Sequence, residues 1–182
     1  MVRNKVFILV IAVVALVLGW RNFSAFEPGD VETRIQAIDK NNNTYQVVRV
    51  IDGDTIKIEY EGKIESVRFI GVNTPEIDQP EKEIESYGQV AAAFTRKLLS
   101  GKRVQMIFDT SQRDKYGRLL GYVYTSDGTF VNALLVKKGY AQVMTVPPDV
   151  TFQALFVELQ RQARKERKGL WGIEKYRLEN PI

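Results

Sequence analysis

The sequence predicts a mainly β domain with a few helices, preceded by a separate hydrophobic segment. Short β-branched runs, separated by turns that contain Gly and Asp, fill the first half of the body. Later segments carry apolar residues at helical spacing. A single uninterrupted apolar run lies near the N-terminus, separate from the body of the chain. With 182 residues, the chain is long enough for one domain plus an extension.

The N-terminal run is expected to direct export. Arg3 and Lys5 precede apolar residues 6–20, a pattern typical of signal peptides. The run is shorter than the about 20 residues that span a membrane comfortably, yet no clear cleavage site follows it. Cleaved signal peptide and uncleaved membrane anchor therefore both stay open for residues 1–20. Because the positive charges come first, either form places the body outside the cytoplasm, secreted or anchored through residues 6–20.

Residues 21–44 read as a linker, and the body is expected to begin with three strands joined by tight turns. These strands cover residues 45–51, 55–60 and 64–72. Asp52-Gly53 separates the first two, which indicates a hairpin in which Gly53 supplies a positive φ.

Two more strands and three helices complete the expected elements. A helix carries Val90, Phe94 and Leu98 on one stripe and ends at Gly101. The remaining elements are strands 104–108 and 119–124, a short helix at 131–136, and a last helix with Phe152, Leu155, Phe156, Leu159 and Ala163 on one stripe.

Five short strands with a helix inserted after the third are the order of a five-stranded OB-type barrel, here with three helices. We expect this domain to cover residues 45–172 and residues 173–182 to form a tail. Such barrels commonly bind nucleic acid or saccharide, although the fold alone does not determine function.

Composition restricts the chemistry of any active site. The chain has no cysteine and no histidine, which excludes thiol nucleophiles, Cys-ligated zinc and imidazole acid–base catalysis. A metal site must therefore consist of oxygen atoms, which favour hard cations such as calcium or magnesium. The formal net charge of +4 permits a polyanionic partner without indicating one.

Polar residues gather where the expected strands end. They are Asp52 and Asp54 at the first turn, Arg68 within the third strand, Asn73-Thr74-Pro75-Glu76 after it, and Arg113 to Arg118 at a later turn. Each has an ordinary structural explanation by itself. Together they offer oxygens for a hard cation, a carboxylate to activate water, and two guanidiniums for phosphate.

These residues resemble the staphylococcal nuclease (thermonuclease) family. The resemblance covers residues 45–171, and the matching segments keep the family's order. They are Val50-Ile51-Asp52-Gly53-Asp54-Thr55, Arg68-Phe69-Ile70-Gly71-Val72-Asn73-Thr74-Pro75-Glu76, Tyr87-Gly88, Asp114-Lys115-Tyr116-Gly117-Arg118 and Gly169-Leu170-Trp171.

The resemblance implies a monomeric, calcium-dependent nuclease that cleaves DNA and RNA and leaves 3′-phosphate ends. It also implies a role for each matching residue. Asp54, Asn73 and the Thr74 carbonyl would bind Ca²⁺, and Asp52 would be an acidic residue next to these ligands without binding the ion itself. Glu76 would act as general base or orient the water. Arg68 and Arg118 would stabilise the phosphate, and Lys115 and Tyr116 would hold the terminal phosphate of the nucleotide.

Two positions depart from the best-known member of the family. Asn73 replaces its second metal-binding aspartate, so we expect weaker calcium binding than in an Asn73→Asp variant, which a calcium titration would check. Thr145 and Pro147 fall where that member has tyrosines, so the wall that stacks on the base is missing or rebuilt, with Tyr140 as a candidate.

Two other functions remain open from the residues alone. A non-catalytic nucleic-acid-binding OB module, tethered at the cell envelope, would use the basic stretch from Arg161 to Lys168. A tethered saccharide- or protein-binding domain would need an aromatic face. Neither requires Asp54, Arg68, Glu76 and Arg118 together, whereas a nuclease does.

Overall fold

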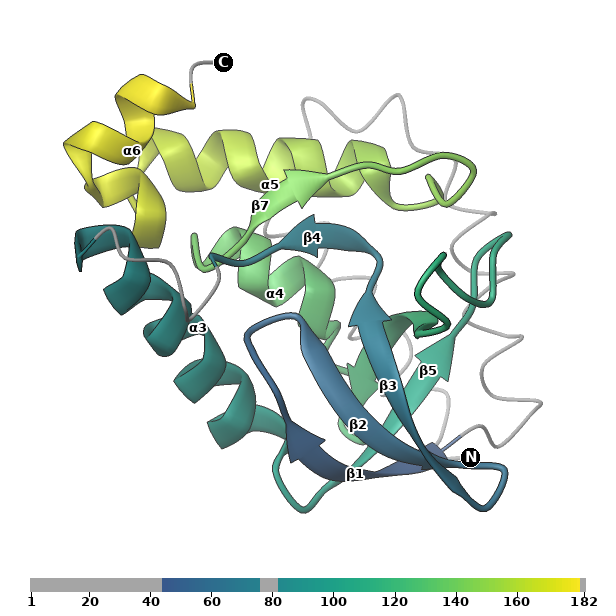
Figure 1. The fold of residues 1–182 in the computed structure, drawn as a ribbon. Coiled ribbons are helices and arrows are strands. Elements are labelled where there is room, and N and C mark those ends of the chain that lie inside the picture. Colours follow the sequence, from purple (N-terminus) through teal and green to yellow (C-terminus); the bar gives the residue numbers. More distant parts are fainter. Residues whose placement is uncertain (1–43, 76–81, 181–182) are drawn as a thin grey trace, which may run out of the picture. The chain divides into compact units, whose positions relative to one another are not determined.

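Strands Thr44–Val50 (β1) and Thr55–Tyr60 (β2) form the antiparallel hairpin that the sequence predicts, with Val50 opposite Ile56. The computed structural model describes residues 44–75 and 82–180. In these residues, a closed five-stranded barrel has the order β1-β2-β3-β6-β5, where β3 is Lys63–Phe69, β5 is Arg103–Ile107 and β6 is Leu119–Thr125 (Figure 1). The pair β3–β6 is parallel and the other barrel pairs are antiparallel. The five-stranded barrel is thus confirmed.

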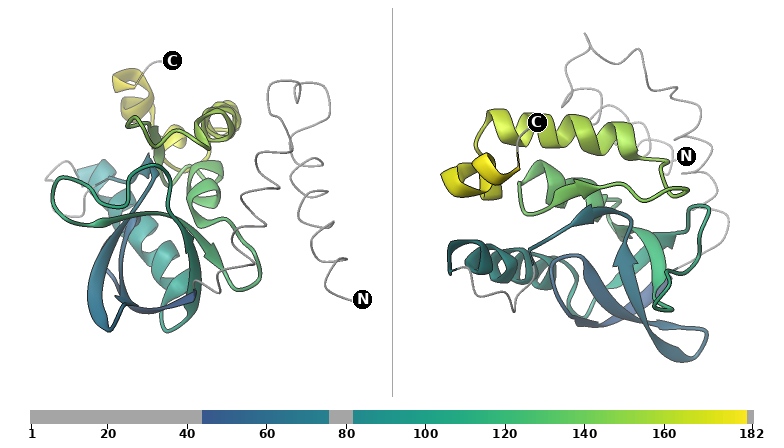
Figure 2. Two further views of the ribbon diagram at one scale, coloured as in Figure 1. Left: turned by 90° about the vertical axis from the view of Figure 1, so that its right-hand side faces the viewer. Right: turned by 45° about the horizontal axis from the view of Figure 1, so that its top comes forward.

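The expected third strand is two strands. β3 ends at Phe69, and a short strand Gly71–Asn73 (β4) pairs instead with Gln142–Met144 (β7). Gly71 has φ +79, and the ring of Phe156 lies 2.5 Å from where a Cβ on Gly71 would be. This bend carries the chain off the barrel, so that the β4–β7 pair lies between the barrel and helix Gln153–Lys165 (α5) (Figure 2).

The three predicted helices are present, and two of them pack directly on the barrel strands. Helix Lys82–Leu99 (α3) lies against β1, Val131–Lys137 (α4) contacts β4 and β6, and α5 packs on α4 and β7. The apolar stripe predicted for α5 is buried at Phe156, Leu159 and Ala163. On α3, however, Val90 from the predicted stripe is 41% exposed, and the helix buries Ala91, Ala92, Thr95 and Leu99 instead.

The end of the expected domain and the expected tail contain further structure. Residues Gly169–Gly172, which close the domain, form a 3₁₀ turn (η2), and Glu174–Glu179 of the tail form a short helix (α6). Trp171 and Tyr176 are buried with Ala163 and Leu170, and Tyr87 of α3 packs against them. This second small core ties the C-terminus to α3 and α5.

The hairpin turn differs from the prediction in its backbone. Gly53 is not in the positive-φ region; it is glycine because a Cβ there would lie 2.6 Å from Thr74 Cγ2 and 2.8 Å from Ala91 Cβ. Space, rather than handedness, requires this residue.

The expected signal or anchor in residues 1–20 and residues 21–43 of the expected linker lie outside the described residues, while Thr44 already belongs to β1. Among residues 44–75 and 82–180, no helix is both long and apolar enough to cross a bilayer.

Candidate functional site

The centre of the site is Asp54, in the turn between β1 and β2. Its side chain is fully buried. Oδ2 accepts hydrogen bonds from the Thr74 N–H at 2.7 Å and the Thr74 hydroxyl at 3.1 Å. Oδ1 accepts one from the Thr55 hydroxyl at 3.1 Å and pairs with Nη1 of Arg68. A buried carboxylate needs such partners, and here donors from two sequence segments fix its orientation.

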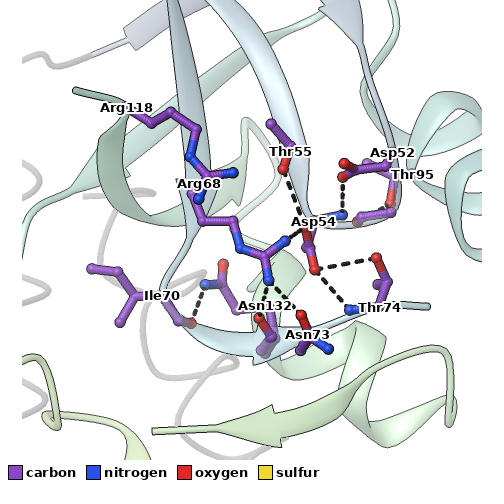
Figure 3. Close-up of polar contacts among 12 residues, drawn as sticks. Asp52, Asp54, Thr55, Arg68, Ile70, Asn73, Thr74, Thr95, Arg118 and Asn132 are labelled. Atoms are coloured by element: carbon purple, nitrogen blue, oxygen red, sulfur yellow. Dashed lines mark hydrogen bonds and ion pairs between the residues drawn. The ribbon is translucent and has the colours of Figure 1, made fainter. Parts of the chain in front are cut away.

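Arg68 lies between two of the predicted metal ligands. Its Nη1 contacts Asp54, while its Nη2 donates to Asn73 Oδ1 at 2.7 Å and to the Val72 carbonyl at 3.4 Å (Figure 3). The Arg68 side chain is 15% exposed, so its charge is mostly removed from water. The Arg68 guanidinium thereby joins Asp54 to Asn73, and Thr74 is joined to them by its hydrogen bonds to Asp54.

The bend at Gly71 makes this meeting possible. Arg68 belongs to the barrel, whereas Asn73 ends β4, which has left the barrel, and Thr74 follows it. The buried Asn132 of α4 holds the junction, because its Nδ2 donates to the carbonyls of Ile70 at 2.9 Å and Gly121 at 3.3 Å. Its Oδ1 accepts from the Val123 N–H at 3.0 Å.

Arg118 projects from the same barrel face as Arg68. In the parallel pair β3–β6, Arg68 is level with Leu120, and Arg118 stands two residues before Leu120. Arg118 directly precedes β6, and Figure 3 shows its side chain together with that of Arg68 on one side of the Asp52–Asp54 turn. Burial raises the pKa of the Asp52 carboxyl, and a Thr55 hydrogen bond and the charges of both arginines oppose this rise only in part. Both guanidiniums therefore lie within electrostatic reach of the Asp52–Asp54 turn (Figure 3).

A tight turn aims Arg118. Asp114 Oδ2 accepts from Arg118 Nε at 2.7 Å, and Asp114 Oδ1 accepts from the backbone N–H groups of Arg118 and Tyr116 at 3.0 and 2.9 Å. Burial of Asp114 would raise its pKa, but these hydrogen bonds and the Arg118 charge outweigh burial and lower it. The Arg118 side chain stays 34% exposed, accessible to a substrate.

The two predicted phosphate contacts are at the surface of this turn. Tyr116 is 72% exposed, with Lys115 Nζ 5.0 Å and Arg118 Cζ 5.6 Å from its ring centroid. Lys115, Tyr116 and Arg118 thus form one basic, partly aromatic edge beside the site.

The remaining predicted positions are Glu76, Tyr140, Thr145 and Pro147. Glu76 lies outside the described residues. Tyr140 packs its ring on Phe94 of α3, with centroids 4.9 Å apart, so this ring supports the helix. Thr145 is half-buried and Pro147 is exposed. Val146, which lies between them in the sequence, and Met144, which precedes Thr145, are also exposed.

Comparison of the sequence with known proteins identifies the family of the chain. The family model described as staphylococcal nuclease homologue matches residues 66–172. The chain is 39% identical over 170 residues to a thermonuclease of Staphylococcus intermedius, covering 93% of this chain and 97% of that protein. The chain belongs to the staphylococcal nuclease family. It is also 39% identical to a thermonuclease of Staphylococcus hyicus over 72% of this chain and 78% of that one, and 38% identical to the endonuclease YncB of Bacillus subtilis (strain 168) over 70% and 61%.

Membership of the staphylococcal nuclease family implies a divalent metal, and the described oxygens suit a hard cation. Asp54 supplies a buried carboxylate, Asn73 an amide oxygen, and Thr74 is held beside both. Within residues 44–75 and 82–180, no three acidic, histidine or cysteine side chains come together. Since Asp54 Oδ1 and Asn73 Oδ1 both contact Arg68, a cation at these oxygens competes with that guanidinium.

Sequence reasoning missed three residues that build this staphylococcal nuclease site. Thr55 and Thr95 donate their hydroxyls to Asp54 and to the Gly53 carbonyl, and Asn132 holds the bend at Ile70. Thr95 and Asn132 are polar residues on the buried faces of helices. A polar residue at a position where the helical spacing predicts an apolar one was the sequence signal that could have identified both.

Proposed function

We propose that this chain is a calcium-dependent nuclease that hydrolyses phosphodiester bonds in DNA, RNA or both, and leaves 3′-phosphate ends. Nuclease activity follows from membership of a family whose matched relatives are thermonucleases and endonucleases. The observation that carries the site assignment is the convergence of Arg68 and Arg118 on one barrel face beside the buried Asp54.

The proposed roles follow from the chemistry of each side chain. Asp54, Asn73 and the Thr74 carbonyl would hold the Ca²⁺, which supplies charge neutralisation at a phosphate oxygen. Glu76 takes a proton from the attacking water or orients that water. Arg68 and Arg118 bind the non-bridging oxygens as negative charge grows, and Lys115 and Tyr116 hold a neighbouring phosphate.

The bond changes in the proposed reaction balance. The water oxygen forms a bond to phosphorus, and the bond from phosphorus to the 5′ oxygen breaks. The leaving 5′ oxygen gains a proton, so the products are a 3′-phosphate and a 5′-hydroxyl. Losing one guanidinium that acts in the transition state costs about 3 kcal/mol, on the order of a hundredfold in rate.

Localisation is a further part of this proposal. The basic residues and apolar run of segment 1–20 support export, either into the medium or to a membrane-anchored position outside the cytoplasm. We propose that the protein acts there as a monomer.

A plasmid assay tests the activity and its location together. Membrane and medium fractions are incubated with plasmid DNA in calcium or in chelator, beside purified Arg118→Ala and Glu76→Ala proteins. We expect calcium-dependent loss of the plasmid in one fraction, and loss of most turnover in both variants with the fold intact. A shifted but uncut plasmid would instead identify a binding module, and full activity of Glu76→Ala would remove its assigned role.

A further inference from the structure

Helix α3 reaches the turn that carries Asp54 through one buried hydroxyl. Thr95 is fully buried on the face of α3 that packs toward β1. Its Oγ1 donates to the Gly53 carbonyl at 2.7 Å, across 42 residues of sequence. A buried carbonyl requires a partner, and the Thr95 hydroxyl supplies one at close range.

The opposite edge of the same peptide unit is held as well. The N–H of Asp54 donates to Asp52 Oδ1 at 3.0 Å. The Gly53 carbonyl and the Asp54 N–H belong to one planar peptide group. Thr95 and Asp52 therefore fix this plane from both sides, and with it the direction in which the Asp54 side chain leaves the backbone (Figure 3).

The turn has little room to move in compensation. Thr74 and Ala91 fill the space beside Gly53 so tightly that a Cβ there would lie 2.6 to 2.9 Å from their side-chain atoms. Thr74 in turn donates twice to the Asp54 carboxylate. The helix, the peptide plane, Asp54 and Thr74 thus form one continuous chain of contacts.

We propose that Thr95 is a positioning residue for the metal-binding carboxylate of Asp54, an inference that rests on the function proposed above. Thr95 touches neither metal nor substrate. It acts by holding the Gly53–Asp54 peptide, so that Asp54 meets Asn73 and Thr74 without reorganisation when a cation binds. Without the hydroxyl, the buried Gly53 carbonyl loses its donor, and rotation of the peptide to find another one turns Asp54 away.

The test compares variants that keep the shape or keep the donor. Thr95→Val preserves the shape and removes the hydroxyl, whereas Thr95→Ser retains the hydroxyl and loses only a methyl group. Calcium affinity is measured by calorimetry on the full chain, with kcat and KM determined at saturating calcium. We expect Thr95→Val to weaken calcium binding about tenfold and Thr95→Ser to stay within about twofold of wild type. In Thr95→Val the rotated peptide must give up its new partner before Asp54 can bind the cation, and leaving a buried carbonyl unpaired then lowers the affinity on the order of tenfold.

A control separates positioning from general loss of stability. Val104, on β5, is buried in the barrel core, so Val104→Ala lowers the unfolding midpoint without touching the turn. It should keep wild-type calcium affinity at temperatures where it is folded. If Thr95→Val fails to fold, Thr95→Ala against Thr95→Ser decides the question, because these two differ only in the hydroxyl.

The outcomes distinguish this inference from the function on which it rests. Wild-type protein that binds no calcium overturns the proposed function, and the inference with it. If wild type binds calcium and folded Thr95→Val or folded Thr95→Ala binds it with the same affinity, the inference is overturned while the proposed function stands. Weakened binding without the hydroxyl and its rescue by Thr95→Ser support the inference.

Discussion

Asp54 accepts donors at every position its carboxylate offers. A carboxylate has about four lone-pair sites, and Thr55, Arg68 and two donors of Thr74 reach them. Arg68 is the partner whose other nitrogen also holds Asn73. Because a divalent cation and a guanidinium repel each other, a cation bound at these oxygens would be opposed by Arg68 until a phosphate drew the guanidinium away.

This competition predicts opposite effects of one substitution on binding and on rate. Arg68→Met should raise calcium affinity several-fold in the absence of nucleotide, because it frees Asp54 Oδ1 and Asn73 Oδ1. It should also lower kcat on the order of a hundredfold or more, since it removes a guanidinium that binds the phosphate of the substrate. Calcium titration and single-substrate kinetics measure the two effects.

Arg118→Met is the matched control for charge. It removes the same positive charge from the same face, but Arg118 is held by Asp114 and not by the predicted metal ligands. We expect a similar loss of kcat and a smaller gain in calcium affinity. Equal gains in the two variants would show that general electrostatics, rather than the contacts of Arg68, set the affinity.

Asp114 makes the turn that carries Arg118 sensitive to acid. Its folded pKa lies below the ordinary value of 3.8, so its ionised form contributes stability above that value, and this contribution is lost as the pH falls through the lower folded pKa. Asp114→Asn should therefore be less stable than wild type near neutral pH, with a difference that shrinks below pH 3.8. Urea unfolding of both proteins across this range checks the prediction; a difference independent of pH would contradict it.

At the scale of elements, the site depends on the break between β3 and β4. In a continuous strand, Arg68, Ile70 and Val72 would share one face, and Asn73 would point to the opposite face from Arg68. The bend at Gly71, filled by Phe156 and held by Asn132, brings Asn73 back to the guanidinium.

Two glycines with the same backbone handedness test this bend. Gly71 and Gly62 have φ values of +79 and +73, but only Gly71 has a neighbour in the Cβ position. Gly62→Ala should cost about 1 kcal/mol of stability from backbone strain alone. Gly71→Ala should cost more, because Phe156 must also move, and it should weaken calcium binding through Asn73. Chemical unfolding and calcium titration of both variants measure this; equal costs would argue against a special role for the bend.

The elements that sequence reasoning found are those with a local signal. Alternation and turn residues identify β1 and β2, and apolar spacing identifies α5, whose Phe156, Leu159 and Ala163 are buried. The break at Ile70 is fixed by more than a local pattern, since Gly71 has φ +79 and the ring of Phe156, distant in sequence, fills the space beside it. Val90 likewise fits helical spacing but faces solvent, because the small side chains of Ala91 and Ala92 let α3 approach the barrel.

For the whole molecule, the sequence could identify the residues that are proposed to carry the chemistry but not the contacts that hold them. Asp54, Arg68 and Arg118 stand in recognisable segments, and the parallel β3–β6 pair brings the two arginines to one face. The partners of Asp54 come from Thr74, 20 residues later, and the support of its turn comes from Thr95, 42 residues after Gly53. Such long-range contacts follow from barrel closure, which no local pattern encodes.

The division of the chain into Met1–Asn41 and Asn42–Ile182 leads to a last prediction. The barrel, the helices and the described site residues all belong to the second unit, which buries its own core of apolar residues from β1 to Tyr176. A chain that begins at Asn42 should therefore unfold at the same temperature as the full-length protein in detergent and cleave plasmid DNA at the same rate. Only its location should change, from the membrane or medium to the cytoplasm of the producing cell. A large fall in thermal midpoint or in kcat would show that the first unit takes part in folding or catalysis, beyond the export proposed for it.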